Sequence, residues 1–229
     1  RHSLENLRTR GEISVAVMPF QNLTNDTVWN IWQSGIQDEL ITLLTFSDEL
    51  KVRQKETTNT LLRSKGLTNY ASIAPDVASM ISKKLDADVF VHGSIKKVGE
   101  IVRLNAQLIN SSNEEIYKSF QIEGKNDDIL HLTDSLSDMV RNSLIITKLI
   151  KGLPGIEQRL PPTNSSEAFR CYLMGEVARS KRDYPEARKL FSQALAIDSN
   201  FYQMNLLLSA VCTNEGRYEE AKEWSIKAY

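Results

Sequence analysis

The sequence predicts two parts of different fold class: a mixed-sheet α/β domain in the order β-α-β-α-β-β-β-α, followed by all-α helical hairpins. Apolar, strand-like runs alternate with helix-like patterns over residues 12–150, and one pattern repeats with a 34-residue offset over 167–229. Helical crossovers early in the domain favour parallel strands, and short turns later favour antiparallel strands. A mixed α+β sheet covered by helices satisfies both.

The first half of this domain is predicted to alternate strands with helices. Residues 13–20 are apolar almost throughout, which indicates a strand buried on both faces, and a polar loop over 21–30 leads into a helix. A second strand is expected at 51–53, then a short helix near Thr60–Ser64, and another from Pro75, because proline suits the first helical position. The core-facing residues expected are Trp32, Ile36, Leu40, Leu43 and Leu44 in the first helix, and Ala78, Ile81 and Leu85 in the last.

The second half is predicted to be a meander of strands. Residues 88–95 form a buried strand, and a last strand is expected around 116–122. Between them, apolar residues alternate with Arg103, Asn105 and Gln107, which indicates an antiparallel strand with one solvated face.

A long helix should close the domain. Asn126 is expected to cap it, with Asp127 and Asp128 favourably placed in its first turn. Three of the six prolines lie in 151–166, which therefore forms a linker, and residues 1–11 are expected to be a frayed polar segment.

The last quarter of the chain resembles two tetratricopeptide (TPR) hairpins, at 168–201 and 202–229. Asp183–Ala187 is followed 34 positions later by Arg217–Ala221, and small or apolar residues recur at the same offset in the pairs Gly175/Ser209, Leu190/Trp224 and Ala194/Ala228. Such a period is typical of TPR repeats, in which small residues let two helices approach closely. The second repeat is read as truncated, so that the array is expected to continue in a longer protein.

TPR hairpins imply a surface that binds a protein or peptide. Polar residues of the first helix of each hairpin are the groove candidates, with solvated charges as the alternative: Arg170, Glu176, Arg179 and Asn205. The unpaired edge of the second hairpin is expected to expose Trp224 and Ile226, and either a second copy of the chain or residues 1–11 would cover it.

The α/β domain resembles the TolB amino-terminal-like family, related to CsgG- and FlgO-type lipoprotein domains. The matching segments are Val15–Asn22, similar to an opening strand with a PF-x-N turn, Gly93–Gly99, similar to GSV-[RK]-x-x-G, and Arg103 with Gln107–Ile109, similar to R-x-x-x-QLI. The resemblance implies a sensory or assembly role. It also implies a place in larger bacterial regulators, beside cyclase, kinase or winged-helix domains and often across one membrane helix.

Composition excludes several classes of function. Lys and Arg number 28 against 29 Asp and Glu, which leaves no basic footprint for nucleic acid. No phosphate loop, nucleophile elbow or metal-ligand spacing is present, and His2, His92 and His131 are interpreted as structural. We therefore predict no catalytic residues, no metal site and no cofactor. Cys171 and Cys212 are too far apart for a disulfide, which favours a reducing compartment.

The loop after the first strand is the candidate ligand or partner site of the α/β domain. It lies at the carboxyl end of a strand, where open α/β sheets tend to bind ligands. Asn22, Thr24 and Asp26 offer hydrogen bonds, and Trp29 or Trp32 offers a stacking face. Asn and Asp there equally suit a turn, and Trp32 equally suits a helix anchor.

The sequence therefore favours a non-enzymatic sensory or protein-interaction module of a bacterial signalling or transcriptional regulator. The alternatives are an envelope lipoprotein-like assembly component, or an enzyme with a nucleotide or small-ligand site on the α/β domain. An extracytoplasmic, periplasmic position on a membrane-tethered protein is expected, with the cytoplasm as the alternative.

Overall fold

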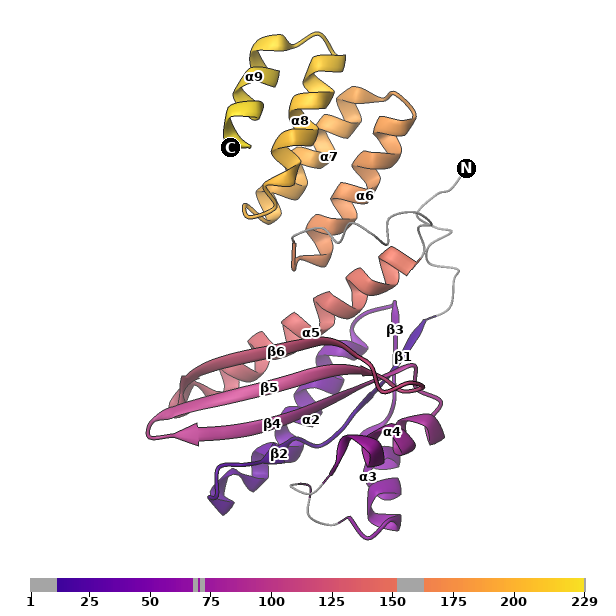
Figure 1. Cartoon of the computed structure of the whole chain (residues 1–229), viewed down its shortest axis with the longest axis vertical. Coiled ribbons are helices and arrows are strands. Elements are labelled where there is room, and N and C mark those ends of the chain that lie inside the picture. The colour runs from indigo at the N-terminus through magenta and orange to yellow at the C-terminus, as the bar shows by residue number, and fades with distance from the viewer. Residues whose placement is uncertain (1–11, 68–69, 71–72, 152–162, 229) are drawn as a thin grey trace. The chain divides into compact units, whose positions relative to one another are not determined.

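The computed structural model describes residues 12–67, 70, 73–151 and 163–228 (Figure 1). The chain forms two compact units. The boundary between them lies between Leu144 and Ile145, inside the last helix of the α/β domain. The sequence places this boundary at 150, but Ile145, Ile146 and Leu149 pack with Phe169 and Leu173 of the helical unit. The predicted segment 1–11 and most of the predicted linker lie outside the described residues.

A mixed sheet forms the first unit, as predicted. Its strand order is β3-β1-β4-β5-β6, with β2 paired to β4. β1 runs parallel to β3 and β4, β2 runs parallel to β4, and β4, β5 and β6 are antiparallel. The strands are β1 (Ile13–Val17), β2 (Gln21–Asn22), β3 (Leu50–Val52), β4 (Val89–Val98), β5 (Ile101–Asn110) and β6 (Ile116–Lys125).

Helices cover the sheet on both faces (Figure 1). On one face, α2 (Asn30–Thr45) and the first part of α5 (Ile129–Lys151) share a core with β1, β4, β5 and β6. On the other face, α3 (Lys55–Ser64) and α4 (Pro75–Lys84) pack on β1, the start of β4 and the end of β5. On these long strands, the second core includes Phe90 and Ile109, and among the described residues no helix of this core packs on the parts of β4 and β5 beyond them.

Strand β1 is buried on both faces, as its apolar run predicts. Val15 and Val17 point into the core under α2, while Ala16 and Met18 belong to the core under α3 and α4. The strand ends at Val17 rather than Phe20, because Pro19 has no N–H to donate. Phe20 leaves the ladder and donates its N–H to the carbonyl of Gln33, at 2.9 Å.

Other expectations need correction. The loop over 21–30 contains β2 and a 3-10 helix, η1 (Thr27–Trp29), and the helix expected near Thr60–Ser64 begins at Lys55. Leu43 is half-buried and belongs to no core cluster of the described residues, whereas Leu85 is half-buried but packs against the core under α4. Asn126 does not cap α5. It begins a 3-10 helix, η3 (Asn126–Asp128), because β6 leads directly into this tighter helix. The side-chain oxygen of Asn126 makes no cap hydrogen bond.

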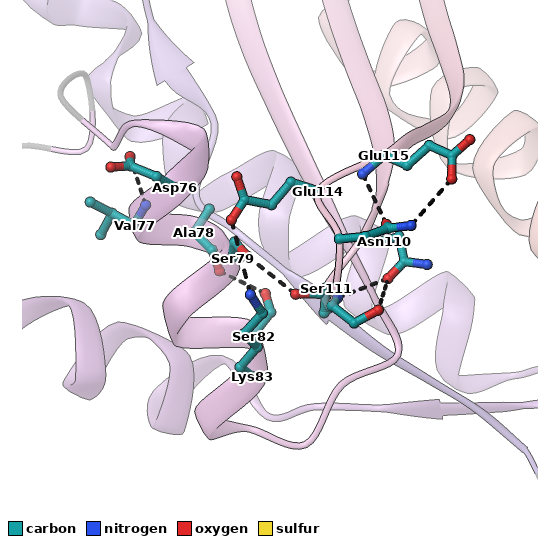
Figure 2. A network of polar contacts seen from close by, with 12 residues as sticks. Asp76, Val77, Ala78, Ser79, Ser82, Lys83, Asn110, Ser111, Glu114 and Glu115 are labelled. Carbon is teal, nitrogen blue, oxygen red and sulfur yellow. Dashed lines mark hydrogen bonds and ion pairs between the residues drawn. The ribbon is translucent and has the colours of Figure 1, made fainter.

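The turn between β5 and β6 is held against α4 (Figure 2). Ser79 Oγ donates to the carbonyl of Ser111 at 3.2 Å, and Lys83 Nζ lies 4.0 Å from the Glu114 carboxylate. Asn110 N–H donates to the Glu115 carbonyl at 2.9 Å, which closes the turn around Glu114 in the left-handed region, at φ 63°. These contacts anchor one end of the meander and leave the opposite end, at the β4–β5 turn, clear of α4.

The second unit contains two helical hairpins. They are built from α6 (Ser166–Ser180) with α7 (Tyr184–Ile197), and α8 (Gln203–Asn214) with α9 (Tyr218–Lys227). The 34-residue period is visible in the backbone, because the left-handed residues in the two tight turns are Arg182, at φ 61°, and Gly216, at φ 76°. Whether the hairpins are TPR repeats stays a prediction.

Hairpin caps follow ordinary helix chemistry. Ser165 Oγ accepts the N–H of Ala168 at 3.2 Å, and Asp183 Oδ1 accepts that of Glu186 at 3.3 Å.

None of the helices among the described residues combines the length and hydropathy needed to cross a bilayer.

Candidate functional site

Nine polar side chains form a grid on the uncovered face of β4, β5 and β6. Strand register places them in three rows: His92–Gln107–Ser119, Ser94–Asn105–Gln121 and Lys96–Arg103–Glu123. The intervening rows, Gly93–Ala106–Phe120 and Ile95–Leu104–Ile122, face the helices α2 and α5. This strict alternation follows from the period of two in a strand. We call these nine residues the polar face.

A hollow of about 440 Å³ lies over the polar face. All of the nine residues except Glu123 line it, and Gln21 of β2 closes one side. A volume of this size is within the range of small-ligand sites, roughly 300–1,000 Å³. Alternation in the sequence predicts the solvated face of β5. The grid could not be predicted, because alternation in one strand does not give its register with the next.

His92 is fixed at the edge of this hollow. Its Nε2 lies 3.1 Å from the carbonyl of Ile73, which also accepts a hydrogen bond from Gln21 Nε2 at 2.8 Å. A carbonyl only accepts, so Nε2 carries the hydrogen and Nδ1 is left as an acceptor. Burial lowers the pKa of His92, and the bond to Ile73 only partly offsets this, so the ring is neutral at pH 7.

The charged row is not balanced. Arg103 donates through Nε and a terminal nitrogen to one Glu123 oxygen, at 2.9 and 2.6 Å. Lys96 stands directly across from Arg103 and makes no hydrogen bond or ion pair with the residues that the structure describes. Two cations against one carboxylate leave this row with a formal charge of +1.

The loop proposed from sequence forms a closed network of its own. Asn22 Oδ1 accepts Thr24 Oγ1 at 2.7 Å, Asn22 Nδ2 donates to the Asp26 carbonyl at 2.9 Å, and Asp26 Oδ1 accepts the Val28 N–H at 3.0 Å. Trp29 is only 6% exposed and packs in the core, with Lys97 Nζ 5.5 Å from its ring centre. Trp29 therefore offers no open stacking face, because the 3-10 helix turns its ring inward. A ligand or partner role for Asn22, Thr24 and Asp26 stays a prediction.

Three of the four groove candidates of the helical unit lie at its surface, and the fourth is buried. Arg170 is half-buried on α6, and Arg179 pairs with Glu176 one turn away, at 2.9 and 2.7 Å, which raises the pKa of Arg179. The prediction that Asn205 lies in an open groove is wrong. It is buried between α8 and α9, where Nδ2 donates to the Lys227 carbonyl at 3.1 Å, because that side of α8 packs against its hairpin partner.

A stripe of exposed residues runs along α8. Leu206 and Ala210 of α8 and Tyr202, the helical-backbone residue just before it, are spaced four residues apart and therefore share one side. The side of Met204 and Leu208 packs in the hairpin core, and the side of Asn205 and Ser209 bonds to α9. We call Tyr202, Leu206 and Ala210 the α8 outer stripe. Its four-residue spacing is present in the sequence, but spacing alone does not show that this side is exposed, because apolar residues at such spacing usually face a core.

Neither thiol is activated. Burial raises the pKa of both Cys171 and Cys212, and both are free. Within the described ranges, no group of three or more His, Cys, Asp or Glu side chains is arranged to hold a metal ion.

Comparison with known proteins gives distant similarity. No family model matches the sequence. The chain is 24% identical over 207 residues to a protein described as putative adenylate cyclase 3 of Rhizobium meliloti (strain 1021). That alignment includes 88% of this chain but 33% of the relative, so the chain spans about a third of the length of the relative it matches.

Solved structures show a similar level of likeness. The LpoB carboxyl-terminal domain from Salmonella enterica has a TM-score of 0.40 at 16% identity, covering 54% of this chain and 92% of that one. Lipoprotein GNA1162 from Neisseria meningitidis has 0.41 at 16%, covering 57% and 99%. TolB from Acinetobacter baumannii has 0.38 at 14%, covering 63% and 29%. Likeness at this level supports no conclusion about function.

Proposed function

We propose that this chain is a non-enzymatic binding module of a larger bacterial signalling protein, and that its helical hairpins hold a protein partner at the α8 outer stripe. The observation that carries the proposal is the exposure of that stripe. Tyr202 is 58% exposed and Leu206 54%, although apolar residues at this spacing usually face a core. Exposed apolar surface with an ordered helix beneath it is typical of interaction sites.

The helical scaffold suits such a role, because the other two sides of α8 are already used. Arg188 of α7 donates to Glu215 at 2.8 Å, and so ties the first hairpin to the turn of the second. A rigid hairpin presents its outer stripe without having to order it on binding, which lowers the entropic cost of association.

The larger context supports signalling as the setting. The alignment to the Rhizobium meliloti protein includes most of both units, and that protein carries the description putative adenylate cyclase. We place this chain beside an effector domain of that kind, in agreement with the regulators that the TolB-like and TPR resemblances imply. An extracytoplasmic position is part of this proposal.

Two alternatives remain as distinct outcomes. An envelope assembly component would use the same surfaces in a lipoprotein setting, and cell fractionation with lipid labelling of the native protein separates it from a signalling protein. An enzyme would turn over substrate, so a panel of nucleotides and of ester and phosphate substrates tests that reading.

Site-specific photo-crosslinking tests the partner proposal. A photoreactive phenylalanine analogue replaces Leu206 in one variant and Ala196, an exposed residue on α7, in the control. In cells that produce these variants, we expect one defined protein to be crosslinked to the variant at position 206. The same adduct should be absent from the variant at position 196. Equal adducts from both positions, or none from 206, would overturn the proposal.

A further inference from the structure

The polar face holds hydrogen-bonding groups that the protein itself does not use. Ser94 and Asn105 are half-buried, and their side chains make no hydrogen bond with any residue that the structure describes. The side chain of Gln121, in the same row, is equally unengaged within the described ranges. Partly burying an amide or hydroxyl without a partner costs free energy, which a bound molecule recovers by supplying the missing bonds.

The net positive charge of the charged row favours a bound anion. Lys96 and Arg103 face each other across neighbouring strands, and like charges in that position repel. Glu123 engages Arg103 only, so the ammonium group of Lys96 lacks a counter-charge at the rim of the hollow. One carboxylate placed beside Lys96 would neutralise the row and relieve the repulsion.

The hydrogen-bonding groups in the rest of the lining favour a ligand with hydroxyl groups. Amide side chains both donate and accept, and serine does likewise. A ligand hydroxyl, which donates and accepts, suits every one of these partners. Ala106 and Phe120 also line the hollow, at the floor of the sheet, and both belong to the row that faces the core.

We propose that the polar face binds a small hydroxyl-rich carboxylate, such as a sugar acid. Its carboxylate lies beside Lys96, and its hydroxyl groups lie over Ser94, Asn105 and Gln107. The hollow of about 440 Å³ accommodates a ligand of one or two sugar units, in the lower part of the range for small-ligand sites. This site is separate from the α8 outer stripe and does not depend on the partner proposed there.

Titration followed by nuclear magnetic resonance tests the inference on the full chain. Sodium glucuronate is the probe, with glucose and sodium acetate as controls that carry only the hydroxyl groups or only the carboxylate. We expect saturable shifts from glucuronate at the backbone of 92–96 and 103–107 and at the side-chain amides of Asn105 and Gln107. Each control probe should bind at least about tenfold more weakly, because it makes only part of the contacts.

Matched lysine variants test the charge. Lys96→Gln should weaken glucuronate binding about tenfold. Lys51→Gln, at an exposed position on β3 outside the hollow, should leave it unchanged. The spectra report directly that each variant is folded. The inference is overturned if glucuronate gives no saturable shift, if the shifts map elsewhere, if Lys96→Gln binds as tightly as wild type, or if glucose or acetate binds equally well.

Discussion

A Cβ atom at Gly175 would lie 2.5 Å from the ring of Phe191, which real Cβ atoms do not tolerate. The first hairpin therefore depends on glycine at this position, as the repeat of small residues predicts. Its helices α6 and α7 approach so closely here that Phe191 occupies the space of a side chain.

Gly175→Ala should destabilise the helical unit by about 1–3 kcal/mol through overpacking. Gly35→Ala is the matched control on α2, where the new Cβ would meet Trp32 at an ordinary 3.5 Å and alanine raises helix propensity. Hydrogen exchange measured on peptides from α6 and α7 reports the change. Unaltered protection in Gly175→Ala would show that the close approach is absent.

The Arg188–Glu215 pair should couple the two hairpins by about 1 kcal/mol, a value reduced for the partial exposure of Arg188. A double-mutant cycle with Arg188→Met and Glu215→Gln measures the coupling from unfolding free energies. The exposed Arg217–Glu220 pair provides a comparison in which little coupling is expected. A coupling no larger than in that comparison would refute the role of Arg188.

His92 should make the α/β domain lose stability in mild acid. Its folded-state pKa is lowered by burial, so its contribution is fully present above the unfolded value of about 6.5 and is lost as pH falls through the folded value. Urea unfolding below about pH 6.5 should therefore show a smaller loss in His92→Gln, whose amide can still donate to Ile73. His131→Gln retains His92 and should follow wild type; the same slope in all three proteins would contradict the account.

Self-association through α9 is a further prediction. Ile226 is 67% exposed, whereas Trp224 is half-buried, with Lys227 Nζ 4.3 Å from its ring centre. An isologous contact would let the same patch serve both copies. Analytical ultracentrifugation should show a dimer at high concentration that Ile226→Glu removes, while Val28→Glu, an exposed residue of the other unit, keeps it. A monomer at every concentration would contradict this.

The sequence predicted most of the architecture, because its strongest patterns depend on local physics. Residues 13–17 need two covered faces, and the structure supplies a helical layer on each. Helices were expected over 167–229, and the structure contains them as two hairpins. Their turns lie 34 residues apart, at Arg182 and Gly216.

What the sequence missed depends on which neighbour an element meets. The sequence predicts Asn205 as a groove residue, but in the structure α9 covers that side of α8. Trp29 reads as an open ring until η1 turns it into the core. The polar face needs the pairing of Ser94 with Asn105 and of Asn105 with Gln121, and register of this kind is set by turns rather than by alternation.

The affinity of the chain for the partner captured at position 206 tests the central claim most directly. Titration calorimetry compares wild type with Leu206→Glu and with the control Ala196→Glu. Because a few buried anchors dominate most interfaces, we predict that Leu206→Glu weakens binding at least about tenfold and that Ala196→Glu binds as wild type does. Equal affinity for all three proteins would contradict a binding site on the α8 outer stripe.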